Sequence, residues 1–174
     1  MTEHWQTIVF LVRHGQTEGD FSLNRAVDQK RPLTEFGQAQ AQAVGQYLAQ
    51  FMPVAIYSSP LDRCQKTAEI ISKQFDRQTD IQTSEKLVES YSPSKSIREG
   101  VGDREETIME MISNHHQGEQ VVVVTHQAFI GSIVADLRGV SYGEVPCAVA
   151  DIYRLVFADS KLVEATRLQP ANIQ

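Results

Sequence analysis

The chain has 174 residues, of which 41% are hydrophobic and 22% are charged, and its formal net charge is −6. These values are typical of a globular protein with one core, and the length is too short for two ordinary domains, so we expect one domain over residues 1–174. The acidic balance disfavours nucleic acids and anionic membranes as partners, because its long-range field repels them.

The first apolar run of the chain, residues 8–12, is too short for a signal peptide or a membrane span. The two cysteines, Cys64 and Cys147, form no metal-ligand spacing and no disulfide framework. We therefore expect two reduced thiols and a cytoplasmic location.

The first half of the chain predicts alternating strands and helices. Residues 7–12 are continuously apolar and rich in β-branched side chains, which is typical of a strand buried on both faces. Residues 16–30 are polar and aperiodic, and we expect a loop there with at most a helical turn. From residue 35 to residue 51 apolar side chains recur at helical spacing, with Thr34 as the expected N-cap.

The rest of the chain continues this alternation. We predict a strand over 54–57, a helix from Pro60 to about 75 with Ser59 as its N-cap, a strand over 81–83, a loop over 90–102, a helix over 104–115, a strand over 120–125, a helix over 129–137, and a hairpin of 148–157 with 161–168. This order predicts an α/β protein, a three-layer α/β/α sandwich with a mainly parallel central sheet and a C-terminal antiparallel hairpin.

Polar residues follow the two most hydrophobic predicted strands at their carboxyl ends. Arg13 and His14 follow the first strand, and His126 follows four consecutive valines and Thr125. The carboxyl ends of parallel strands are where α/β proteins place their ligand sites, so neighbouring strands would bring the two histidines within a few ångströms. An arginine at a buried strand end is costly unless it meets an anion.

A third motif lies where the strand over 54–57 turns into the next helix. The sequence Ser58-Ser59-Pro60-Leu61-Asp62-Arg63 places an arginine in the first helical turn, where free N–H groups already favour an anion. A guanidinium there can bind a phosphoryl group bidentately. Each motif alone also fits an ordinary surface arginine or a structural histidine, and their combination favours a phosphate site.

Taken together, these motifs resemble the histidine phosphatase superfamily, also called the phosphoglycerate mutase-like family. Its signature is an Arg-His-Gly box, a Ser-Pro-x-x-Arg box and a second histidine after a buried strand, and the resemblance covers residues 8 to about 155. The resemblance implies that His14 becomes phosphorylated while Arg13, Arg63 and His126 surround the phosphoryl oxygens. It also implies a substrate-binding role for Thr17.

The same resemblance implies a proton donor. Glu89 matches this residue in a Leu-x-Glu context, and such a carboxyl protonates the leaving oxygen and then accepts a proton from water. Glu85 is an alternative acid. An exposed loop glutamate is the competing interpretation of Glu89.

The chain also departs from the family pattern. Asp20 stands where the family often has asparagine, and we expect it to point away from the phosphate or to contact another part of the substrate. Gln127 follows the second histidine where glycine is frequent, and we include it among the substrate-binding residues because its backbone N–H is unchanged. His4, His115 and His116 lie outside all motifs, and we expect them to be solvated.

The resemblance implies a phosphatase with a phosphohistidine intermediate, with no metal and no cofactor, acting on a phosphoprotein or a small phosphate ester. The short chain looks similar to small bacterial phosphohistidine phosphatases, whose substrates are phosphorylated protein histidines. Two alternatives stay open: a phosphomonoesterase for sugar or nucleotide-type substrates, and a non-catalytic module that binds phosphorylated ligands. A mutase is disfavoured, because mutases of the family are generally longer.

Overall fold

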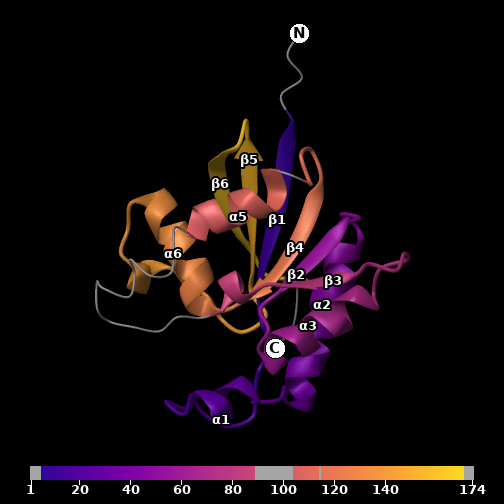
Figure 1. Cartoon of the computed structure of the whole chain (residues 1–174), viewed down its shortest axis with the longest axis vertical. Helices are drawn as coiled ribbons and strands as arrows, with labels where there is room; N and C mark the ends of the chain where they lie inside the picture. The colour runs from indigo at the N-terminus through magenta and orange to yellow at the C-terminus, as the bar shows by residue number, and fades with distance from the viewer. Residues whose placement is uncertain (1–4, 89–103, 114, 171–174) are drawn as a thin grey trace.

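The computed structural model describes residues 5–88, 104–113 and 115–170. Among these residues, six strands form one sheet in the order β3-β2-β4-β1-β5-β6 (Figure 1). The strands are β1 (Gln6–Arg13), β2 (Ala55–Ser58), β3 (Ile81–Thr83), β4 (Gln120–Thr125), β5 (Ile152–Ala158) and β6 (Lys161–Leu168). The first four in spatial order are parallel, and β5 and β6 add an antiparallel hairpin beside β1. The predicted mainly parallel sheet is confirmed.

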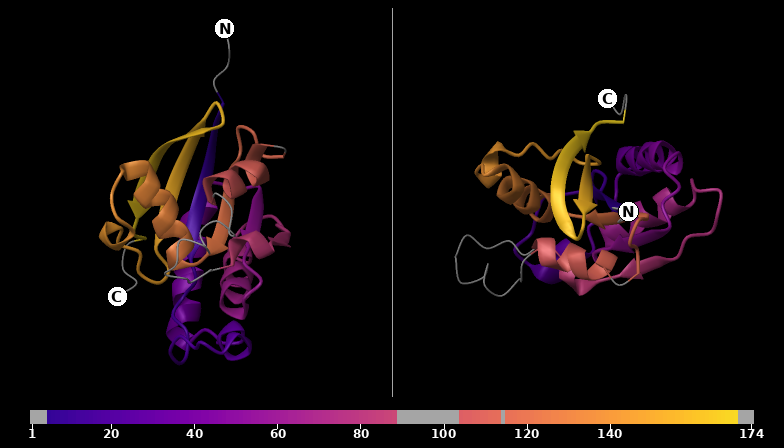
Figure 2. Two further views of the ribbon diagram at one scale, coloured as in Figure 1. Left: turned by 60° about the vertical axis from the view of Figure 1, so that its left-hand side comes forward. Right: turned by 90° about the horizontal axis from the view of Figure 1, so that it is seen from above.

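Helices cover both faces of the sheet, as Figures 1 and 2 show, with α2 and α3 on one face and α5 and α6 on the other. The described helical segments are α1 (Arg25–Gln29), α2 (Glu35–Ala49), α3 (Asp62–Ser72), α5 (Arg104–Ser113), α6 (Gln127–Arg138), and the 3₁₀ turns η1 (Glu85–Leu87) and η2 (Tyr142–Glu144). The three-layer sandwich is therefore confirmed. Within the polar stretch 16–30, the helical turn that we allowed for is α1.

The central strands are buried on both faces because their side chains alternate between two cores. Val9 and Leu11 of β1 join the core under α5 and α6. Phe10 and Val12 join the core under α2 and α3. All four side chains are fully buried, which explains why β1 has no polar alternation until it ends at Arg13.

The start of α2 packs tightly against the loop that follows β1. A Cβ at Gly37 would lie 2.1 Å from the Gln16 carbonyl oxygen, and one at Gly15 would lie 2.4 Å from the Gly37 carbonyl oxygen. Both positions therefore require glycine. The predicted N-cap is confirmed, because the Thr34 hydroxyl accepts a 2.9 Å hydrogen bond from the Gly37 N–H. The Gln40 side chain accepts a second bond, from the backbone of Gln16.

Several predicted boundaries are wrong. Helix α2 ends at Ala49 rather than at residue 51, and α6 begins at Gln127 rather than at residue 129. Helix α3 begins two residues later than predicted, with Leu61 rather than Ser59 as its N-cap. The Ser59 hydroxyl accepts a 3.5 Å bond from the Leu61 N–H and lies 2.9 Å from His126 Nε2. Strand β5 begins at Ile152 rather than at residue 148. There, the Asp151 carboxylate accepts a bond from the Ala148 backbone and holds a turn.

The prediction that His116 is solvated is also wrong, because only 8% of it is exposed. Its Nε2 lies 2.7 Å from the Tyr57 hydroxyl and its Nδ1 lies 2.9 Å from Glu119 Oε2. These bonds join the start of β4 to β2 and give His116 a structural role. His115 is exposed, and His4 lies outside the described residues.

Candidate active site

The site is assembled by the register of the parallel strands at their carboxyl ends. Strands β1 and β4 are neighbours, with Arg13 opposite Thr125. Backbone bonds continue past both ends, from the His14 N–H to the Thr125 carbonyl and from the Ser59 N–H to the Val124 carbonyl. As predicted, the two histidines meet, and the ring centroids of His14 and His126 are 5.4 Å apart.

His14 is held as a neutral imidazole with a defined tautomer. Its Nδ1 lies 2.8 Å from the Gly15 carbonyl oxygen, which only accepts hydrogen bonds, so Nδ1 carries the proton and Nε2 keeps its lone pair. Burial lowers the pKa of His14 from 6.5 to about 3, against an opposing effect of the Gly15 bond and with help from the charges of nearby arginines. An imidazole of this kind is a nucleophile at neutral pH.

His126 forms the second side of the site and is fully buried. Burial, followed by repulsion from His14 and nearby arginines, lowers the pKa of His126 well below its usual value of 6.5. Its Nε2 lies 2.9 Å from the Ser59 hydroxyl and 3.5 Å from the Cys64 thiol. Cys64 packs inward as expected, and it also contacts this histidine, which the sequence did not indicate.

Two arginines near the site, the half-buried Arg13 and the buried Arg63, each have one unsatisfied donor. The Nε atoms of Arg13 and Arg63 are buried and have no hydrogen-bond partner among the residues that the structure describes. Arg63 is 1% exposed, and such unpaired buried donors are costly. Arg13 is held by the Cys147 carbonyl oxygen through a 2.6 Å bond from one terminal nitrogen. Both charges lower the pKa values of the two histidines, so they act on the same small region.

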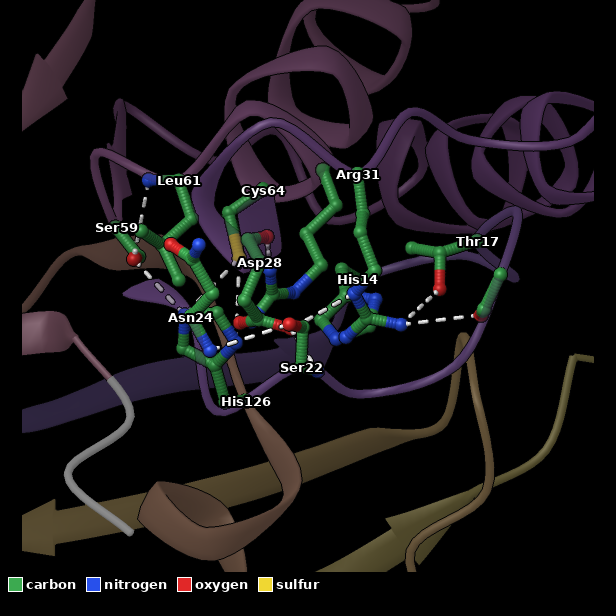
Figure 3. A network of polar contacts seen from close by, with 12 residues as sticks. His14, Thr17, Ser22, Asn24, Asp28, Arg31, Ser59, Leu61, Cys64 and His126 are labelled. Atoms are coloured by element: carbon green, nitrogen blue, oxygen red, sulfur yellow. Dashed lines mark hydrogen bonds and ion pairs between the residues drawn. The ribbon is translucent and has the colours of Figure 1, made fainter. Parts of the chain in front are cut away.

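The structure adds a carboxylate and a third arginine that the sequence analysis missed (Figure 3). Asp28 of α1 is buried, and it accepts bonds from Arg63 at 3.2 Å and from Arg31 at 2.8 Å. Arg31 also donates a 2.9 Å bond to the Thr17 hydroxyl. The positive charge of Arg31 helps to lower the pKa values of His14 and His126. Thr17 is therefore joined to the site through Arg31.

The remaining predicted residues have different outcomes. Glu89 lies outside the described residues, although the Thr125 hydroxyl binds the carbonyl oxygen of Leu87, two positions earlier. Glu85 and Asp20 are exposed. Gln127 is half-buried as the first residue of α6, directly after His126.

Within residues 5–88, 104–113 and 115–170, no group of three or more His, Cys, Asp or Glu side chains could hold a metal ion. In the same ranges no helix is long and apolar enough to cross a membrane.

Comparison with known proteins places this chain in a family. The model of the histidine phosphatase superfamily (branch 1) matches residues 9–94 and 91–167. The chain therefore belongs to the histidine phosphatase superfamily, which confirms the resemblance carried by the Arg-His-Gly and Ser-Pro-x-x-Arg motifs.

Relatives and solved structures agree with this placement. An uncharacterized protein of Mycobacterium tuberculosis is 27% identical, over 97% of this chain and 98% of that protein. A metal-independent phosphoserine phosphatase of Arabidopsis thaliana is 29% identical, over 73% of this chain and 67% of that protein. The structure of the protein histidine phosphatase SixA complexed with tungstate has a TM-score of 0.71 at 19% identity, covering 96% of this chain and 99% of that one. At that identity the similarity concerns the fold.

Proposed function

We propose that this protein is a phosphatase that transfers a phosphoryl group to His14 and then to water. The observation that carries this proposal is the state of His14: Nδ1 donates to a carbonyl, and the low pKa keeps Nε2 unprotonated. A nucleophile in this state suits attack on phosphorus better than simple anion binding. The charges of Arg63 and Arg13 act on it, and the Nε atoms of both arginines have no partner among the described residues.

The reaction has two steps. In the first, the Nε2 lone pair of His14 attacks phosphorus, the bond to the leaving group breaks, and the leaving group takes up a proton, from Glu89 for an alkoxide or from water for an imidazole. In the second, water attacks the phosphohistidine and gives up a proton to Glu89 or to the solvent, inorganic phosphate is released, and His14 regains its lone pair. Arg13 and Arg63 balance the charge that spreads over the phosphoryl oxygens in each transition state. No step calls for a metal ion.

We infer different roles for the other site residues. His126 and Thr17 border the phosphoryl group, with the Gln127 backbone N–H beside them, and Arg31 supplies a third positive charge. Glu89 is the proposed acid that protonates an alkoxide leaving group. Asp28 positions Arg63 and Arg31 by accepting bonds from both.

Of the two substrate classes, we favour a phosphohistidine in a protein. An imidazole leaves more readily than an alkoxide, so its departure needs a weaker acid. A small phosphate ester is the second candidate, and the similarity to the metal-independent phosphoserine phosphatase favours it. Both candidates share the phosphohistidine intermediate.

A substrate panel tests the proposal. We would compare kcat/KM for a phosphohistidine peptide, phosphoserine, sugar phosphates and nucleotide monophosphates, with His14→Gln as the inactive control. We expect the phosphohistidine peptide to be hydrolysed most efficiently. Tight phosphate binding without turnover of any compound would instead identify a binding module.

The same panel tests Glu89. We expect Glu89→Gln to slow hydrolysis of an alkyl phosphate by about 10²–10⁴-fold, because the alkoxide must be protonated as it leaves. The loss on phosphohistidine should be much smaller. An equal loss on both substrates would contradict the assignment of Glu89 as the acid.

A further inference from the structure

The Arg13 guanidinium is held by the loop that precedes β5, residues 146–151. The carbonyl oxygen of Cys147 in this loop accepts a 2.6 Å hydrogen bond from Nη1 of Arg13. A guanidinium presents its donors in a fixed planar fork, so a bond at Nη1 restricts the direction of the opposite edge, which carries Nε. That Nε is buried and has no hydrogen-bond partner among the described residues. The Cys147 carbonyl therefore controls where the unpaired donor of Arg13 points.

Backbone hydrogen bonds fasten this loop to the end of β1. The Arg13 N–H donates to the Asp151 carbonyl oxygen at 3.0 Å. The Ala150 N–H donates to the His14 carbonyl oxygen at 3.2 Å. Ala150 has a φ of 60°, a conformation that residues other than glycine adopt rarely and that persists only where the surroundings impose it. The loop therefore has a defined conformation beside both Arg13 and the proposed nucleophile.

An ion pair of the C-terminal hairpin restrains the same loop. The buried Asp151 carboxylate accepts bonds from two nitrogens of Arg167, at 2.8 Å and 2.6 Å. The same carboxylate oxygen accepts a 2.6 Å bond from the Ala148 N–H. That N–H and the Cys147 carbonyl are opposite sides of one planar peptide group, so the carboxylate that binds the N–H also fixes the direction of the carbonyl. Arg167 therefore acts on Arg13 through Asp151 and this peptide group.

We propose that Asp151 and Arg167 are positioning residues for the phosphatase reaction, and that they hold the Arg13 guanidinium in the orientation that binds the phosphoryl group. This inference rests on the proposed function and adds two residues that act through Arg13 rather than on the substrate. Fixed cations stabilise a transition state only when they are in place before its charge develops. A displacement of about 1 Å in such a group can slow a reaction by about 100-fold. An ion pair that only stabilises the hairpin is the competing explanation.

A double-mutant cycle between Arg167 and Arg13 tests this proposal. We would measure kcat for phosphoramidate, a small phosphoryl donor, and the dissociation constant of inorganic phosphate, at a temperature at which every variant is folded. We expect Arg167→Gln to lower kcat by about 10–100-fold and to weaken phosphate binding. In an Arg13→Ala background the same substitution should change either quantity by less than about twofold, because no guanidinium is left to position. A purely structural ion pair would cause equal losses in both backgrounds.

Arg154→Gln is the matched control. Arg154 pairs with Glu164 across the same hairpin at 3.1 Å, and its side chain is 29% exposed compared with 26% for Arg167. This variant should keep the kcat and the phosphate affinity of the wild type. Arg167→Lys retains the charge but cannot donate through two nitrogens, so we expect it to fall between the wild type and Arg167→Gln. Asp151→Asn removes the charge at the other end of the pair and should show the same coupling to Arg13.

The outcomes separate this inference from the proposed function. Turnover by the wild type together with an unchanged kcat in Arg167→Gln, or with equal losses in both backgrounds, overturns the positioning role and leaves the phosphatase intact. An equal loss in Arg154→Gln also overturns it, because any ion pair of the hairpin would then have the same effect. No turnover by the wild type overturns the proposed function itself. The phosphate affinities then decide the positioning role alone: a loss that depends on Arg13 supports it, and a loss that does not overturns it.

Discussion

At the scale of single residues, the site depends on removing water from two imidazoles while keeping positive charge beside them. His14 and His126 are both buried at the ends of neighbouring strands. Desolvation disfavours their protonated forms, and the arginines add to the effect. The arginines that we propose to stabilise a phosphoryl group therefore also keep the two imidazoles neutral.

The lowered pKa of His14 predicts a pH-dependent part of the stability. The imidazole takes up a proton near pH 6.5 in the unfolded chain but only at about pH 3 in the folded protein, so the unfolded state binds more protons between these values. The contribution is complete above about pH 6.5 and is lost as the pH falls toward 3, by about 1.4 kcal/mol per pH unit.

Urea denaturation measures this contribution. Between pH 7 and pH 5 we expect the free energy of unfolding to fall by about 2 kcal/mol more in the wild type than in His14→Gln, which cannot titrate. The same pH dependence in both proteins would show that the folded His14 has an ordinary pKa.

We predict that the Asp28 carboxylate and a bound phosphate compete for the guanidinium of Arg63. In Asp28→Asn, the guanidinium of Arg63 stays buried with its charge uncompensated, so we expect a loss of stability on the order of 3 kcal/mol. Inorganic phosphate should raise the melting temperature of this variant more than that of the wild type, because it replaces the missing negative charge and no longer competes with Asp28.

Thermal denaturation with and without inorganic phosphate checks this prediction. Asp20→Asn removes an exposed carboxylate from the same polar stretch, residues 16–30, and should behave like the wild type. A phosphate-induced shift of equal size in Asp28→Asn and the wild type would show that Asp28 does not share cations with the substrate.

At the scale of elements, helices α2 and α3 position the loop that carries His14. Gly15 and Gly37 touch through their backbones, and the Gly15 N–H donates to the Thr67 hydroxyl of α3. Thr67 in turn donates to the carbonyl oxygen of Arg63. His14, the proposed nucleophile, and Arg63, a proposed phosphate-binding residue, are thus joined through Thr67 and the backbone of α3.

The close contact at Gly37 predicts a severe effect of a single methyl group. Gly37→Ala would place its Cβ 2.1 Å from the Gln16 carbonyl oxygen, and relieving this clash costs about 3 kcal/mol or more. We expect both a lower melting temperature and a large loss of kcat in the folded fraction. Gly143→Ala, whose Cβ would meet nothing within 4 Å, should change neither. Wild-type activity in Gly37→Ala would mean that the loop does not need this contact.

The elements also show what the sequence could predict. Continuous apolar runs made β1 and β4 recognisable, and with them the positions of Arg13, His14 and His126. Helix α1 was recognisable only as a possible helical turn, because it buries Asp28 instead of an apolar stripe and so has no hydrophobic period. Arg31 and Asp28 stand in an aperiodic polar stretch, and only the fold brings them to the site.

At the scale of the whole molecule, the sheet order determines which chain segments meet. Placing β4 between β1 and β2 brings the ends of all three strands together, although His126 is more than a hundred positions from His14. Strand order follows from long-range pairing, which local sequence patterns do not contain. The family motifs supplied that information, and the register Arg13–Thr125 explains why they recur together.

The most direct measurement is the detection of phosphorylated His14. The protein would be mixed with ³²P-labelled phosphoramidate, denatured at alkaline pH to preserve phosphohistidine, and mapped by mass spectrometry. We predict a base-stable, acid-labile phosphoryl group on His14 and none in His14→Gln. A phosphoryl group on any other residue, or undiminished turnover by His14→Gln, would contradict the role of His14 as the nucleophile.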